Sequence, residues 1–128
     1  MDLSPATIYS LHCPSPCELR PWLLAHGAPE AEPGAFQQVL ARLGRRHEAN
    51  HLAGLGPVAD LSGGTFAERI ERTGESIASG ERALYQPIFQ STIRIDGEEV
   101  RVVGIPDFLI RDGAAYRGRD CKLALPAD

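Results

Sequence analysis

The sequence predicts an α+β fold in which helices precede an antiparallel sheet. Apolar residues recur at helical spacing before Gly80, whereas β-forming residues dominate after it. Two dipeptides, Asp96-Gly97 and Asp112-Gly113, divide this second part into three segments. Both residue types tolerate the positive φ of tight hairpin turns, so the three segments are expected to pair as antiparallel strands.

Two short helices are expected at the start of the chain. Ser4-Pro5 and Ser15-Pro16 each have the pattern of an N-cap followed by proline at the first helical position. We expect the second helix to be bent or broken at Pro21 and to end at Gly27.

Two further helices should follow a loop over residues 28 to 34. The first runs from Phe36 to Gly54 or Gly56, and the second begins at a capping box formed by Thr65 and Glu68 and stops at Gly80. The side chains expected to face inward are Phe36, Val39, Leu40, Leu43 and His47 on the first helix, and Phe66, Ile70 and Ile77 on the second.

The expected strands cover ALYQPIFQSTIRI, VRVVGIPDFLI and AAYRGRDCKLAL. Residues 1–128 are interpreted as one domain, since this length suits a single core. A three-stranded sheet needs cover on both faces, and the preceding helices can cover only one. We therefore expect the chain to be truncated at its C-terminal end, with the missing segment or a second copy in a homodimer covering the other face.

Composition excludes some classes of protein. The chain has no apolar run of eighteen residues and no basic-then-apolar N-terminal signal, which predicts a cytoplasmic protein without a membrane partner. Three cysteines argue against a disulfide framework. A net charge of −4 does not indicate a nucleic-acid binder, although a bound metal would neutralise several acids.

His47, Glu48 and His51 spell the H-E-x-x-H pattern of zinc proteases. Both histidines would lie on one helical face as zinc ligands, with Glu48 as the general base. A third ligand would be needed, and Glu71 or Glu75 on the next helix could supply it.

Three observations count against the zinc protease. The strands follow this helix, whereas in such proteases the sheet comes earlier in the chain. Arg45 and Arg46 lead into the pattern, where uncharged residues are usual. The protease also leaves unused the carboxylates of the C-terminal half.

Those carboxylates are Asp107 on the second expected strand and Asp120 on the third. Asp120 and Lys122, the only lysine, are two residues apart, so they should share one face at about 7 Å. Cys121 would point the other way, and the hairpin would bring Asp107 alongside. The alternative is an exposed charged face without a function.

Two converging carboxylates repel each other unless a cation neutralises them. Oxygen ligands suit Mg²⁺ or Mn²⁺, which can activate water and stabilise charge on a phosphate. Lys122 could hold or deprotonate the attacking water, and the imidazole of His47 could complete the metal shell. This combination predicts metal-assisted hydrolysis of phosphodiesters.

Taken together, the segments CPSPCELRPWL, GRRHEA, ALYQPIF, GIPDFL and YRGRDCKLA resemble the RecB-like branch of the PD-(D/E)XK nuclease superfamily. The resemblance implies a restriction-endonuclease-like αβββαβ core, of which the expected elements are the first four. It also implies Mg²⁺- or Mn²⁺-dependent hydrolysis of DNA, with single-stranded DNA or ends as substrate.

By this resemblance, His47, Asp107 and Asp120 are metal ligands, the Cys121 carbonyl adds another, and Lys122 is the catalytic lysine. The resemblance also implies that Glu48 is a catalytic residue, the acidic residue of the family's first helix motif, near this metal or at a second one. Tyr85 and Gln86 are implied to support the site. His51 then completes the H-E-x-x-H pattern by accident.

The chain also departs from the family. Relatives continue with a helix and a strand after the lysine, and some hold an iron–sulfur cluster. Cys13 fits the first cluster position, but the C-terminal cysteines are missing and Cys17 fits no position, so we expect no cluster and interpret both residues as buried.

A nuclease-like module that binds DNA or docks a partner without activity is the alternative to a nuclease. DNA phosphates would be contacted by arginines such as Arg42, Arg45, Arg46 or Arg117.

Overall fold

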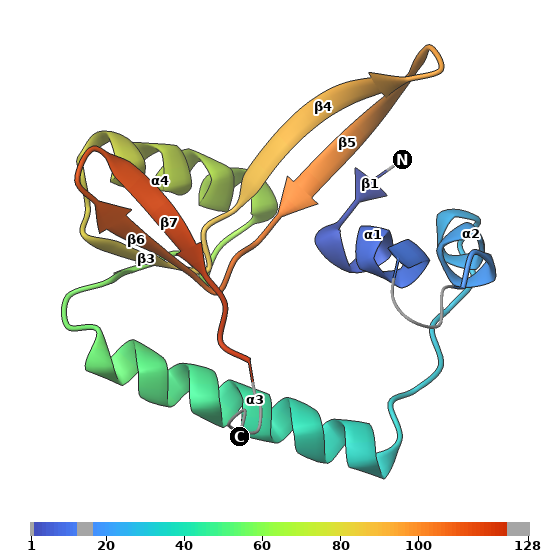
Figure 1. Ribbon diagram of the computed structural model, residues 1–128, viewed down its shortest axis with the longest axis horizontal. Helices are drawn as coiled ribbons and strands as arrows, with labels where there is room; N and C mark the ends of the chain where they lie inside the picture. The colour runs from blue at the N-terminus through green and yellow to red at the C-terminus, as the bar shows by residue number, and fades with distance from the viewer. Residues whose placement is uncertain (1, 13–16, 123–128) are drawn as a thin grey trace. The chain divides into compact units, whose positions relative to one another are not determined.

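The computed structural model describes residues 2–12 and 17–122, and it combines helices with β-sheets, which confirms the α+β class (Figure 1). The chain forms two compact units. The first contains Met1–Glu32 and Phe89–Gly104, and the second contains Pro33–Ile88 and Ile105–Asp128. No helix in the described ranges has the length and apolar character needed to span a bilayer.

The first unit is built on a hairpin of β4 (Phe89–Ile95) and β5 (Glu98–Gly104), with β1 (Asp2–Leu3) pairing parallel to β5. Its helices are α1 (Pro5–His12) and α2 (Leu19–Ala25).

The caps of these two helices follow the local sequence. The Thr7 N–H donates to Ser4 Oγ at 3.1 Å, which confirms the predicted start of α1. Gly27 has φ of 76° and follows α2, as predicted. The predicted break at Pro21 is wrong, because Pro21 lies in the first turn of α2, where no N–H is needed. Ser15-Pro16 lies outside the described residues.

The second unit contains a four-stranded sheet with the order β2-β3-β6-β7, in which only the β2–β3 pair is parallel. Two helices accompany it, α3 (Ala35–Gly54) and α4 (Phe66–Ala78). The strands are β2 (Ala59–Asp60), β3 (Ala83–Tyr85), β6 (Phe108–Asp112) and β7 (Ala115–Arg119).

The prediction of one three-stranded antiparallel sheet is wrong, because two of the expected strands are divided by prolines. Pro87 separates β3 from β4, and Pro106 separates β5 from β6. Proline has no N–H to donate to a strand ladder, so pairing stops at both positions. The third expected strand ends at Arg119, which leaves Asp120 and Lys122 beyond it.

The hairpin turns are close to those predicted. Asp96 and Gly97 have φ of 50° and 86°, as a two-residue turn of the expected kind requires. The second turn is shifted by one residue. Asp112 still pairs with Ala115, and the positive φ of 63° falls on Gly113.

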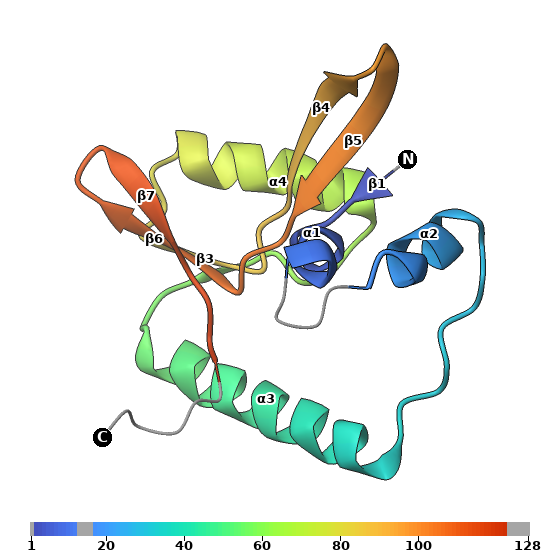
Figure 2. The same ribbon diagram turned by 45° about the vertical axis from the view of Figure 1, so that its right-hand side comes forward.

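One face of the second unit's sheet forms its apolar core. Leu84 and Leu109 pair across β3 and β6 and cluster with Leu61, all three buried. Ile77 of α4 and Tyr116 of β7 pack against this cluster. Helix α4 therefore covers this face (Figure 2).

The opposite face belongs to α3. Tyr85 and Phe108 form the pair next to Leu84 and Leu109 across β3 and β6. Successive residues of a strand point to opposite faces, so Tyr85 and Phe108 face away from the apolar core. The rings of Tyr85 and His51 both contact the fully buried Phe108, at centroid distances of 5.3 and 4.9 Å. The end of α3 that carries His51 thus lies against this face.

Most of the predicted inward face of α3 is exposed instead. Phe36 is 73% exposed, and Val39, Leu40, Leu43 and His47 are exposed as well. The 20-residue helix is about 30 Å long, whereas the five residues of β6 extend about 17 Å, so α3 extends beyond the sheet.

The capping box of α4 is confirmed, with the Thr65 N–H donating to Glu68 Oε2 at 2.7 Å and the Glu68 N–H donating to Thr65 Oγ1 at 3.3 Å. Phe66 was expected inside but is 41% exposed, since it occupies the first helical position, before α4 reaches the sheet.

Thr73 links α4 to the chain beyond β3, and its replacement by the isosteric valine should destabilise the protein. Its side chain is buried, donates to the Arg69 carbonyl at 2.7 Å and accepts the Ile88 N–H at 3.1 Å. Thr73→Val leaves that N–H unsatisfied, which should cost about 1–3 kcal/mol in urea unfolding. The exposed Thr92→Val in β4 is the control, and equal stability of both variants would contradict this role.

Candidate functional site

Gln86 is the residue around which the predicted site residues meet. It follows β3 with φ of 55°, a left-handed conformation that is uncommon for a residue with a side chain. Its N–H donates to the Asp107 carbonyl at 2.9 Å, and its Nε2 donates to Glu48 Oε1 at 2.9 Å. Gln86 therefore joins the helix motif of α3 to the segment before β6.

Asp107 extends this network to the end of β7. Its Oδ2 accepts the main-chain N–H of Cys121 at 2.6 Å. A short hydrogen bond to a carboxylate is stronger than one between neutral groups. Glu48, Gln86, Asp107 and Cys121 thus form a continuous chain of contacts from four separate segments.

The electrostatics of Tyr85 and Cys121 reflect the carboxylates around them. Burial, a hydrogen bond to Glu48 and the charges of Glu48, Asp60 and Asp107 raise the pKa of Tyr85 to about 12. Burial and the charges of Asp107 and Glu48 also raise the pKa of the Cys121 thiol, with Arg119 acting in the opposite direction. Glu48 and Asp107 therefore act on the same small volume.

Arg69 of α4 holds the main chain of Gln86. Its Nε donates to the Leu61 carbonyl at 2.7 Å, and its Nη2 donates to the Gln86 carbonyl at 2.9 Å. These two bonds fix the positive-φ conformation from which the Gln86 side chain reaches Glu48. The sequence alone gave no reason to select this arginine among twelve.

Asp60 is a second residue that sequence reasoning missed. It pairs with Tyr85 across β2 and β3 and so lies on the same face. Its carboxylate accepts the N–H and the hydroxyl of Ser62, which lower its pKa. Asp60 lies in the segment GPVADLSGG, whose composition is that of a loop, and a two-residue strand leaves no periodic signal in the sequence.

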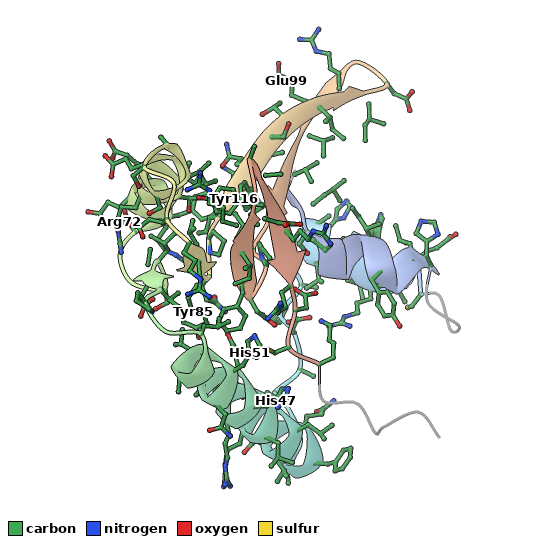
Figure 3. All side chains as sticks on the ribbon, turned by 60° about the vertical axis from the view of Figure 1, so that its left-hand side comes forward. His47, His51, Arg72, Tyr85, Glu99 and Tyr116 are labelled. Carbon is green, nitrogen blue, oxygen red and sulfur yellow. The ribbon has the colours of Figure 1, made fainter. Side chains whose placement is uncertain are left out.

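The remaining predicted residues lie apart from this network. Asp120 Oδ2 and Lys122 Nζ are 3.5 Å apart in an ion pair with both side chains exposed. The prediction that a strand holds them on one face is wrong, because β7 ends at Arg119. His47 is exposed on α3. His51 lies near Tyr85, with its Nε2 3.4 Å from Arg119 Nη1 (Figure 3).

The donors suit a hard divalent cation in chemistry, since carboxylate and carbonyl oxygens are typical ligands of Mg²⁺ and Mn²⁺. Their arrangement is incomplete. In the described part of the chain, no three His, Cys, Asp or Glu side chains are gathered to hold a metal ion. This applies to His47, Asp107 and Asp120, and equally to His47 and His51 with Glu71 or Glu75.

The cysteines provide no cluster site in the described residues. Cys17 is exposed, so its predicted burial is wrong, and Cys13 lies outside the residues that the structure describes.

Comparisons with known proteins give no assignment: no family model, curated protein or solved structure matches this chain.

The pKa of Tyr85 predicts a distinct phase in an alkaline titration of tyrosine absorbance. The phase near pH 12 should be absent in Tyr85→Phe and should shift to lower pH in Glu48→Gln, which removes the negative charge of Glu48. Tyr116→Phe is the control and should keep it.

The same shift makes stability depend on pH. The folded state holds the Tyr85 proton more tightly than the unfolded state, in which the pKa of this tyrosine is near 10. The resulting contribution to the free energy of unfolding is complete below pH 10 and is lost between pH 10 and 12. A phase of tyrosine absorbance near pH 12 that persists in Tyr85→Phe would disprove the assignment of this pKa to Tyr85.

Proposed function

We propose that this chain is a metal-dependent nuclease domain that hydrolyses phosphodiester bonds in DNA, of the RecB-like branch of the PD-(D/E)XK superfamily and with its restriction-endonuclease-like fold. One observation carries the proposal. Glu48, Gln86, Asp107 and Cys121 come from four sequence motifs and form one hydrogen-bonded network.

The network supports the proposal because its members are far apart in sequence. GRRHEA, ALYQPIF, GIPDFL and YRGRDCKLA are the segments that carry the resemblance, and residues of all four meet on the α3 face of one sheet. Glu48 and Asp107 repel each other as like charges, and a cation shared by both would offset this repulsion.

A bound Mg²⁺ or Mn²⁺ would neutralise these carboxylates and lower the pKa of a coordinated water. The residues proposed to hold it are the Asp107 and Asp120 carboxylates, the Cys121 carbonyl and His47, with Glu48 nearby. Lys122 is the proposed catalytic lysine, and its ion pair with Asp120 keeps its ammonium group beside a proposed ligand. Single-stranded DNA or DNA ends are the proposed substrate.

One observation favours an alternative, a nuclease-like module that binds DNA or a partner without cleaving it. In the described residues, His47, Asp107 and Asp120 are not gathered into a metal-binding group. This alternative expects binding without turnover, and the zinc-protease alternative expects zinc binding that ignores Asp107.

Calorimetric titration with Mn²⁺ and Zn²⁺ separates these functions. Asp107→Asn removes the charge of the proposed ligand but keeps an oxygen that can accept the Cys121 N–H. Asp96→Asn is the matched control, because asparagine also tolerates the positive φ of that turn. His51→Ala tests the zinc site.

We expect Mn²⁺ binding in the wild type, Asp96→Asn and His51→Ala, and its loss in Asp107→Asn. A labelled single-stranded oligonucleotide should then be cleaved with Mn²⁺ by the wild type and not by Lys122→Ala. Manganese binding without cleavage would favour the inactive module. Tight zinc binding that needs His51 and ignores Asp107 would favour the protease, and the absence of any metal binding would refute the nuclease.

A further inference from the structure

An open groove runs along the hairpin of β6 and β7. It has a volume of about 380 Å³, and its charged lining consists of three arginines and one aspartate. The residues that line it are Ile110, Arg111, Asp112, Arg117, Gly118 and Arg119.

The strand register shows which arginines lie on the site's face of the sheet. Arg119 pairs with Phe108 and Arg117 with Ile110, so both share the face of Phe108. Arg111 pairs with Tyr116 on the other face, where it donates to the carbonyls of Gly80 and Gly113. Arg111 is therefore engaged in holding the fold.

Arg117 and Arg119 remain accessible to a ligand. Both are exposed, and Arg117 forms an exposed ion pair with Asp112 through its Nε. Exposed pairs of this kind contribute little stability, so replacing the Asp112 carboxylate by a phosphate would cost little. Arg119 lies 3.4 Å from an imidazole nitrogen of His51, which is not a competing anion.

The two arginines also lead to the candidate site. They are two residues apart on β7 and hence about 7 Å apart along the strand. Asp120 and Cys121 follow Arg119 directly, and the Cys121 N–H is bound to the Asp107 carboxylate. Two cations along a strand that leads to a site for phosphodiester chemistry suit a specific ligand. That ligand is an extended polymer with one negative charge on each unit.

We propose that Arg117 and Arg119 form an arginine strip that binds the phosphates of single-stranded DNA along β7 and directs the strand toward Asp107. The inference rests on the proposed nuclease function and adds to it the path of the substrate. Phe108 is fully buried, so it offers no stacking surface for bases. Because both arginines contact phosphates, binding at the strip is electrostatic and independent of sequence.

The test is fluorescence anisotropy of a labelled oligothymidylate of about 16 nucleotides, titrated at several salt concentrations in EDTA so that no cleavage occurs. The test variant is Arg117→Gln/Arg119→Gln. The control is Arg20→Gln/Arg94→Gln, which changes the net charge equally and removes two arginines from exposed ion pairs with Glu30 and Glu99.

In the strip variant, the slope of log K against log salt should become less steep by about 1.4, since each phosphate contact to a single strand contributes about 0.7. Binding should also weaken about tenfold or more at 0.1 M salt. The control should match the wild type. Equal losses in both variants, no binding by the wild type, or equally effective competition by polyglutamate would each overturn the strip.

Asp107→Asn separates this inference from the nuclease proposal. It should bind the oligonucleotide at least as well as the wild type while losing Mn²⁺ binding and cleavage. If the strip variant binds and cleaves like the control, the strip is wrong and the nuclease stands. If the strip binds DNA but no metal binds, the nuclease fails and the DNA path remains.

Discussion

The site of this protein depends on two hydrogen bonds accepted by a single residue, Asp107. Its carbonyl accepts the Gln86 N–H at 2.9 Å, and its carboxylate accepts the Cys121 N–H at 2.6 Å. One residue thereby joins the segment after β3, the start of β6 and the segment after β7. Because Gln86 in turn donates to Glu48, the position of α3 relative to the sheet also depends on these bonds.

The site lies where the strand ladder stops. Pro87 follows Gln86, and Pro106 precedes Asp107, so the Gln86–Asp107 hydrogen bond is formed beside two residues that have no N–H to donate. Beyond β3 the chain leaves the regular sheet conformation, and Gln86 adopts φ of 55°. This departure allows the Gln86 side chain to turn toward α3, which a continuous strand would not permit.

Features that depend on neighbouring residues could be predicted from the sequence, as the capping box of Thr65 and the turn at Asp96-Gly97 illustrate. The bounds of α3 were also predicted closely. The division of the strands is not visible in their β-propensity, because it follows from the missing N–H groups of Pro87 and Pro106. The exposure of the α3 face could not be predicted, because it depends on how far the sheet extends. The roles of Asp60, Arg69 and Arg119 depend on side chains that only the fold brings together. Spacing singled out Asp107, whereas the resemblance to RecB-like nucleases singled out Glu48, Gln86 and Cys121. Neither predicted the hydrogen bonds between them.

The two hydrogen bonds that Arg69 donates to the carbonyls of Leu61 and Gln86 link the local stability of α4 to the site. Arg69 belongs to this helix, so transient unfolding of its first turns releases the carbonyls of Leu61 and Gln86 together. Local opening of α4 and loss of the Gln86 conformation are therefore one cooperative event with a shared free energy. A ligand that binds only the closed arrangement of Glu48 and Gln86 will slow amide hydrogen exchange in α4, a helix on the far side of the sheet from where it binds.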